Sequence, residues 1–395
     1  LSLLTLTCGN TASLTPTVPT PTPAPPTATA TPIPAPVTPT DTPYPPLSFT
    51  SPVEGYVVLT NAGPGDPYYH AALRLSEYRD GDVITFRESP STAENALRTA
   101  EVRFVALVVL PETMDEDLAW EVYQLAKGMD AEYDTDFAYG FISGITADDV
   151  LHYVDNLAAY EGGLTELNTE FRVVWRTGEG AISGGAGSLA DDDAQAAVDL
   201  FAQMGFDAAR IDGDQLTKEE ILAEISQSGV LYFNLHASPT YFEISRRENT
   251  SEGVSAEDIP EMERALLIFH TGCFAGAVHK WYNQSASAPP SYDQRARFVD
   301  PSESLALNFL RNGTLAYVGH LCMWGPGGWP VILMEELAAD PSMTLGELMV
   351  IWYNLPSGPN IIEESAASDI IGMDNNRFYN AAMVLYGDPA LRIIR

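Results

Sequence analysis

Two short apolar runs in this sequence each end on a residue that can take part in catalysis. Residues 230–238, VLYFNLHAS, lead to His236, and residues 266–276, LLIFHTGCFAG, lead to Cys273, which Gly272 precedes. Both runs have the length of a buried strand, and the glycine lets the chain turn tightly. A thiolate attacks carbonyl carbons well, and a nearby imidazole can supply the proton of the leaving group. The pair predicts nucleophilic catalysis, provided that the two strand ends meet.

Each of these residues also has a plainer interpretation. A single histidine at a strand end is more often a structural residue, and most cysteines are small buried hydrophobes. A disulfide between Cys273 and Cys322 is an alternative, as is a metal site built from His270, His279 and Cys273. No carboxylate or second cysteine completes a known ligand spacing, so we assign no metal ligand. The joint placement at equivalent strand ends favours the catalytic interpretation.

The elements that must position this pair alternate along the chain. From about Gly55, short apolar runs alternate with segments of helical periodicity, which predicts parallel strands covered by helices on both faces. In such α/β sheets ligands bind at the carboxyl ends of the strands, where His236 and Cys273 are expected. Four helix starts carry capping-box signals. These are Thr146 with Asp149, Thr217 with Glu220, Ser255 with Asp258, and Thr344 with Glu347.

The composition excludes several classes of partner. The chain has 395 residues, of which 54 are acidic and 20 basic, for a formal net charge of −34. So negative a field repels phosphate groups, which excludes nucleic acid and anionic membrane surfaces as partners. With 45% hydrophobic residues the chain can bury a substantial core, and three cysteines are too few for a disulfide framework.

The N-terminal segments predict an exported protein. Residues 1–8, LSLLTLTC, resemble the end of a bacterial lipoprotein signal with Cys8 as the acylated residue, although Thr7 replaces the usual small residue; an ordinary secretory signal is the alternative. Residues 9–52 form a Thr/Pro-rich linker that we expect to be disordered, because proline lacks a backbone donor. The prediction is an extracellular or cell-surface bacterial protein held by a lipid on Cys8, with any membrane contact made through that anchor.

The motifs together resemble those of gingipain-type cysteine peptidases, which have a caspase-like hemoglobinase fold. The resemblance is carried by VLYFNLHAS, by LLIFHTGCFAG, by residues 134–150 and 312–324, and by the terminal MVLYGDPALRI, and it spans about Gly55 to Arg395. It implies an α/β caspase-like sandwich of parallel strands in two subdomains. We expect a smaller subdomain at 53–165 and a catalytic one at 166–395.

The resemblance also implies roles for individual residues. Cys273 would be the nucleophile and His236 the proton carrier, with an oxyanion hole formed by the backbone N–H groups of Cys273 and Ala237. The family usually has glycine where Ala237 stands, which is the one departure. Trp324 would line the substrate pocket. Glu179 is a candidate for orienting His236 because it follows a preceding predicted strand, and the alternative is a solvated loop acid.

The predicted function is therefore a cysteine-type endopeptidase that hydrolyses proteins or peptides through a thioester on Cys273. The alternative is a catalytically inactive gingipain-like domain that serves as a binding or scaffolding module. No cofactor is required for this chemistry, and the resemblance leaves room for structural calcium.

Overall fold

The computed structural model describes residues 47, 49–130, 134–164, 168–175, 187–212, 215–247, 250–262, 265–282, 296–322, 329–355 and 380–393. Three residues predicted to act in the protein, Cys8, Glu179 and Trp324, lie outside these ranges, as does the linker up to residue 46.

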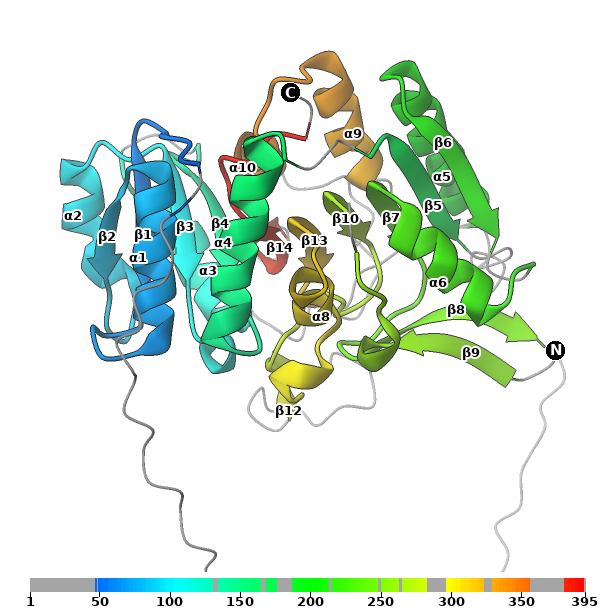
Figure 1. Cartoon of the computed structure of the whole chain (residues 1–395), viewed down its shortest axis with the longest axis horizontal. Helices are drawn as coiled ribbons and strands as arrows, with labels where there is room; N and C mark the ends of the chain where they lie inside the picture. The colour runs from blue at the N-terminus through cyan, green and yellow to red at the C-terminus, as the bar shows by residue number, and fades with distance from the viewer. Residues whose placement is uncertain are drawn as a thin grey trace, which may run out of the picture. The chain divides into compact units, whose positions relative to one another are not determined.

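Within the described residues, a ten-stranded sheet runs through the domain in the order β2-β1-β3-β4-β14-β13-β10-β7-β5-β6 (Figure 1). The strands are β1 (Tyr56–Thr60), β2 (Asp82–Thr85), β3 (Phe104–Val108), β4 (Ala138–Ile142), β5 (Glu170–Trp175), β6 (Asp207–Asp212), β7 (Val230–Asn234), β10 (Leu267–His270), β13 (Ala316–His320) and β14 (Met383–Gly387). The predicted α/β fold with a mostly parallel sheet is confirmed, with one difference: β14 runs antiparallel to β13.

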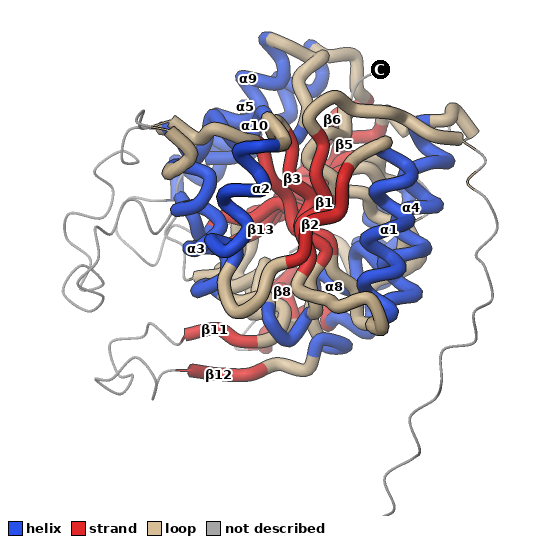
Figure 2. Tube along the Cα trace, turned by 90° about the vertical axis from the view of Figure 1, so that its left-hand side faces the viewer, coloured by secondary structure: helices blue, strands red, loops and turns tan. Residues whose placement is uncertain are grey.

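Helices cover both faces of this sheet, as Figure 2 shows: α1, α4 and α8 lie on one side and α3, α5, α9 and α10 on the other. Their bounds are α1 (Pro67–Arg79), α3 (Glu116–Lys127), α4 (Ala147–Glu161), α5 (Gly187–Gln203), α8 (Leu305–Arg311), α9 (Trp329–Ala339) and α10 (Leu345–Asn354), and two further helices are α2 (Glu94–Thr99) and α6 (Lys218–Gln227). In the described part of the chain no helix is both long and apolar enough to cross a membrane.

The four predicted capping boxes are present. Each cap hydroxyl accepts a hydrogen bond from the backbone N–H three residues later, and the acid there accepts one from the cap's own N–H. They open α4, α6, α10 and a short 3₁₀ helix, Ala256–Asp258. Local sequence thus fixes where these elements begin.

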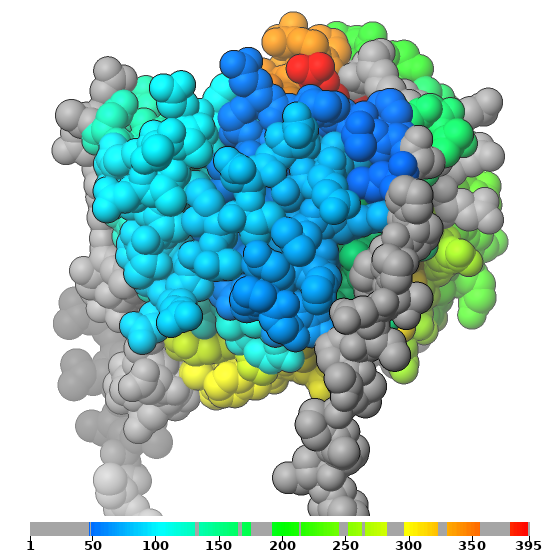
Figure 3. Space-filling view, turned by 60° about the vertical axis from the view of Figure 1, so that its left-hand side comes forward, coloured from blue at the N-terminus to red at the C-terminus, as the bar shows by residue number. Residues whose placement is uncertain are grey.

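The strands of residues 53–165 form one half of the sheet and those of 166–395 the other, with β4 beside β14. In the space-filling view of Figure 3, the elements from β1 to α3, coloured blue to cyan, form the surface at the end of the sheet that residues 53–165 build. The division into a smaller and a catalytic subdomain stays a prediction.

Two hairpins that the sequence patterns did not predict follow the strands of interest. β8 (Tyr241–Arg247) pairs with β9 (Thr250–Ser255) soon after His236. β11 (Lys280–Tyr282) pairs with β12 (Ala296–Phe298) soon after Cys273. Each candidate catalytic residue therefore lies in a short connection between the central sheet and a small hairpin.

A buried ion network ties the chain's Gly-Asp-Pro ending to the first helix. Arg79, 1% exposed, donates through Nε to Asp388 Oδ2 at 2.7 Å and through both terminal nitrogens to Glu161 at 2.7 and 2.8 Å. Asp388 is fully buried and also accepts a hydrogen bond from the backbone N–H of Ala390. The network joins α1, α4 and the segment after β14, and the pairing with Arg79 lowers the pKa of Glu161 despite its burial.

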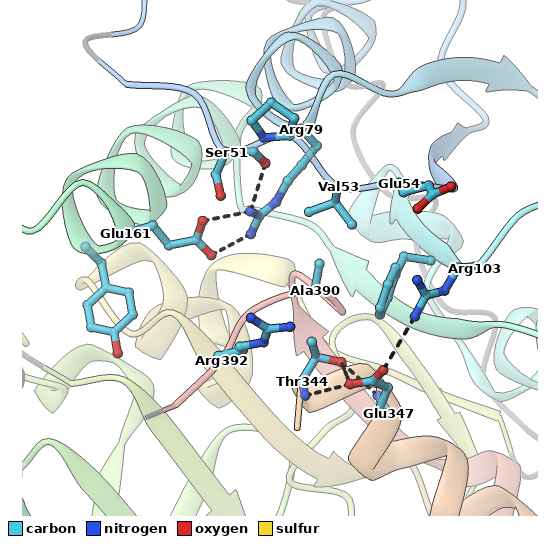
Figure 4. Close-up of a pocket in the computed structure, with 13 residues that line it drawn as sticks. Ser51, Val53, Glu54, Arg79, Arg103, Glu161, Thr344, Glu347, Ala390 and Arg392 are labelled. Carbon is cyan, nitrogen blue, oxygen red and sulfur yellow. Dashed lines mark hydrogen bonds and ion pairs between the residues drawn. The ribbon is translucent and has the colours of Figure 1, made fainter. Parts of the chain in front are cut away.

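A pocket of about 430 Å³ lies next to this network (Figure 4). It is lined by residues that precede β1 and β3, such as Val53 and Arg103, together with Glu161 and Glu347. Those residues stand at the amino ends of β1 and β3, whereas His236 and Cys273 follow the carboxyl ends of β7 and β10. The pocket is therefore separate from the predicted catalytic pair.

Replacing Arg79 with methionine should destabilise the fold by about 3–5 kcal/mol, because it leaves the buried Asp388 and the partly buried Glu161 without their cation. Urea unfolding followed by circular dichroism measures this loss. The matched control is Arg98→Met, which breaks an exposed pair with Glu94 (41% and 43% exposed) and should cost less than about 1 kcal/mol. Equal losses in the two variants would contradict the structural role of the buried network.

Candidate active site

The two candidate catalytic residues follow adjacent parallel strands in matching register. β7 and β10 pair along their length, with Phe233 opposite His270 at the last rung. His236 and Cys273 lie at the same offset beyond that rung. Thr271 locks the strand ends, because its backbone N–H and its hydroxyl both donate to the Phe233 carbonyl at 3.0 Å. The structure thus places the two connections side by side at one edge of the sheet.

The connection that carries His236 is held in an extended form. The His236 carbonyl accepts a hydrogen bond from the N–H of Glu243 at 2.8 Å, and Ala237 forms an antiparallel bridge with Phe242. The His236 side chain is exposed. Ala237 is not among the described non-glycine residues with positive φ. A Cβ is therefore tolerated at position 237, and the departure from the family's glycine introduces no left-handed strain.

Gly272 makes room for that alanine. A Cβ built on Gly272 would overlap the methyl group of Ala237 and would lie 2.9 Å from the carbonyl oxygen of Leu235. The backbones of the two connections therefore approach each other closely at these positions. The approach is direct evidence that the residue after His236 and the residue before Cys273 are in contact.

Cys273 lies in a tight, strained turn and is half-buried. The N–H of Ala275 donates to the Gly272 carbonyl at 3.3 Å, and Phe274 has φ of 59°. A left-handed conformation costs a residue with a side chain roughly 1–2 kcal/mol. Two contacts hold Phe274 in this conformation. Its N–H donates to the Cys322 carbonyl at 3.0 Å, and its ring packs on that of Trp281 with the centroids 4.5 Å apart.

The second cysteine of the domain has a different environment. Cys322 is fully buried, and burial, followed by the neighbouring Glu116 and Cys273, raises the pKa of its thiol well above the usual value. It is not joined to Cys273 by a disulfide. A protonated, inaccessible thiol is a poor nucleophile, so Cys273 stays the candidate nucleophile of the two.

An acidic segment at the start of α3, residues 115–117, contacts the strand β11 that follows the cysteine turn. Glu116, the first residue of α3, is 2% exposed, and its burial raises the pKa of the carboxyl group well above the usual value. The flanking Asp115 and Asp117 bind Lys280 Nζ at 3.4 and 3.1 Å. These ion pairs anchor β11, which follows the cysteine turn. Sequence patterns did not single out this segment, since its partners lie some 165 residues away.

The alternative metal site of His270, His279 and Cys273 is not formed among the described residues. His270 is fully buried with Nδ1 2.7 Å from the hydroxyl of Tyr317, and His279 Nδ1 lies 3.1 Å from the Val299 carbonyl. Burial lowers the pKa of His270 to about 3, so its ring is neutral. Among the residues that the structure describes, no group of three His, Cys, Asp or Glu side chains could hold a metal ion.

The fold and the paired strand ends define a protein of the gingipain and caspase-like class. The model of peptidase family C25 matches residues 81–394. The chain therefore belongs to peptidase family C25 and is a cysteine-type peptidase that acts on proteins or peptides.

Solved structures agree on the fold. The Arg-specific cysteine proteinase gingipain R (RgpB) is 11% identical, with 87% of this chain and 80% of that chain covered and a TM-score of 0.55. The complex of the Porphyromonas gingivalis RgpB pro- and mature domains is 12% identical, with 86% and 79% covered and a TM-score of 0.53. No curated protein sequence matches the chain.

The contact between the two connections predicts an energetic coupling between Gly272 and Ala237. Gly272→Ala should destabilise the protein by about 1–3 kcal/mol, because the added methyl group must displace its neighbours. Removing the opposing methyl group in Gly272→Ala/Ala237→Gly should restore part of this loss, giving a coupling energy of about 1 kcal/mol in urea unfolding. Gly65→Ala is the control, since a Cβ there meets nothing within 4 Å. Additive effects of the two substitutions would contradict the contact.

Proposed function

We propose that this protein is an endopeptidase in which the thiolate of Cys273 attacks the carbonyl carbon of the scissile peptide bond. The attack forms a C–S bond and places a negative charge on the carbonyl oxygen. Collapse of this intermediate breaks the C–N bond, and the imidazolium of His236 gives its proton to the departing amine. Water, deprotonated by His236, then attacks the thioester, the C–S bond breaks, and the carboxylic acid leaves while the Cys273 thiolate and the His236 imidazolium are regenerated.

The observation that carries this proposal is the matching register of β7 and β10, which brings the histidine and cysteine connections together. The contact between Gly272 and Ala237 supports an oxyanion hole built from the N–H groups of Cys273 and Ala237, because it holds the two peptides next to each other. Such donors stabilise the charge that develops in the transition state, and losing one costs about 2.7–4 kcal/mol.

Three further parts of the proposal rest on the sequence alone. Glu179 would orient the His236 ring, and Trp324 would line the pocket for the residue before the scissile bond. Structural calcium could bind elsewhere, but no step of the proposed chemistry requires it.

The proposed location is the outer surface of a bacterial cell. A lipid on Cys8 would anchor the chain, and the Thr/Pro-rich segment would act as a spacer that lifts the domain from the membrane. The acidic net charge of −34 suits a soluble domain held away from an anionic surface. Mass spectrometry of the natively expressed protein tests this part, and a mature chain that begins beyond Cys8 without an acyl group would contradict it.

A library of peptides carrying a thiol-reactive warhead tests the chemistry directly. We expect one label per chain, on Cys273, together with hydrolysis of matching fluorogenic peptides, and both should disappear in Cys273→Ala. Cys322→Ala is the matched control and should keep its label, because that thiol is buried and protonated.

Two outcomes would contradict the proposal. Equal labelling of Cys273 and Cys322, or full activity in Cys273→Ala, would exclude Cys273 as the nucleophile. A wild-type protein that hydrolyses no member of a broad peptide library, with calcium present, would instead favour a binding or scaffolding module.

A further inference from the structure

A buried tyrosine reaches the strained turn of Cys273 from the neighbouring strand β13. Tyr317 is fully buried, and its hydroxyl donates to the carbonyl oxygen of Ala275 at 2.9 Å. The same hydroxyl lies 2.7 Å from His270 Nδ1. A tyrosine hydroxyl has one proton, which Ala275 already receives, so the His270 Nδ1–H must be the donor to Tyr317. The neutral state of the buried His270 ring is consistent with this direction.

Ala275 transmits this constraint to the candidate nucleophile. Its N–H donates to the Gly272 carbonyl at 3.3 Å, which fixes one side of the peptide that joins Gly272 to Cys273. No cis peptide bond is present in the described residues, and in a trans peptide the N–H points opposite to the C=O. The N–H of Cys273 is therefore directed away from Ala275. In the proposed function it is one of the two oxyanion donors.

The His270 ring packs against the same part of the turn, next to Gly272. A Cβ on Gly272 would lie 3.0 Å from His270 Nε2, so the imidazole ring is in close packing with this part of the turn. Phe233 and Phe242 hold the ring in place, with centroids 5.1 and 5.6 Å from it. The ring and the tyrosine hydroxyl therefore form one rigid support.

We propose that Tyr317 is a positioning residue whose hydroxyl, held by the Nδ1–H of His270, orients the Gly272–Cys273 peptide so that its N–H receives the oxyanion. This inference rests on the proposed peptidase function. In this role, His270 and Tyr317 contact neither the substrate nor the reacting atoms. This role also explains why a neutral histidine is buried directly under the cysteine turn.

The same turn offers a matched control. Tyr386, from β14, is also fully buried, and its hydroxyl donates to the next carbonyl, that of Gly276, at 2.7 Å. The N–H of Gly276 bonds to the His320 carbonyl and not to the Gly272–Cys273 peptide. Tyr386→Phe thus removes an equivalent buried hydrogen bond without touching the chain of contacts that orients the Cys273 N–H.

The experiment compares peptide hydrolysis with alkylation of Cys273 by iodoacetamide in the full chain, well below the unfolding temperature of each variant. Alkylation displaces iodide and forms no oxyanion, so it reports on the thiol alone. In Tyr317→Phe we expect kcat to fall at least tenfold, with KM within twofold and the alkylation rate within threefold of wild type. Tyr386→Phe should keep kcat within threefold.

Variants of His270 separate the hydrogen bond from simple packing. His270→Asn places an amide donor near the position of Nδ1 and should retain kcat within about threefold. His270→Leu removes the donor and should lower kcat as Tyr317→Phe does. These two variants also decide the matter if Tyr317→Phe fails to fold.

Each remaining outcome overturns a defined claim. An active wild type with unchanged kcat in Tyr317→Phe, equal losses in the two tyrosine variants, or equal losses in the two His270 variants would overturn the positioning role alone. A parallel fall in kcat and alkylation would show that Tyr317 supports the thiol instead of the oxyanion donor. A wild type without hydrolysis would overturn the proposed function, and the positioning role with it.

Discussion

The pairing of β7 with β10 is the constraint on which the rest of the site depends. With Phe233 opposite His270, the histidine and cysteine connections leave the sheet at the same level. A shift of one residue in a strand moves its side chains to the other face, so the register must be held firmly. Thr271 does this, because its backbone N–H and its hydroxyl both donate to the Phe233 carbonyl. Everything that we attribute to Cys273 and His236 follows from that alignment.

Two unusual residues near this alignment, Ala237 and Phe274, are accommodated by the residues around them. The methyl group of Ala237 occupies space that Gly272 leaves open, which avoids a clash between the two connections. Ala237 is also not among the described residues with positive φ, so a side chain at this position introduces no left-handed strain. The strained Phe274 is held by a hydrogen bond to the carbonyl of Cys322, just beyond the end of β13, and by packing on Trp281. Residues in rare backbone conformations persist only where their surroundings over-determine them, and they cluster at functional sites. The cysteine turn meets that description.

The sequence predicted those features that depend on local chemistry. Apolar runs located β7 and β10, and hydroxyl and acid pairs located four helix starts. It could not predict that β14 is antiparallel to β13, since an apolar run carries no signal of direction. The hairpins after His236 and Cys273, and the hydroxyl of Tyr317 on the cysteine turn, arise from tertiary contacts that no spacing rule encodes. Glu179, from its place after a predicted strand, and Trp324, from the family resemblance, stay predictions that only the sequence supports.

The central claim is that His236 and Cys273 act as one catalytic pair, and the pH dependence of Cys273 alkylation tests it without knowledge of the substrate. Iodoacetamide labelling, followed by mass spectrometry, is compared between wild type and His236→Gln from pH 5 to 10. If the imidazole takes the thiol proton, wild type should react at least tenfold faster at pH 6, and the rates should converge above about pH 9, where an isolated thiol ionises unaided. Superimposable profiles would show that the two residues do not communicate and would contradict the account.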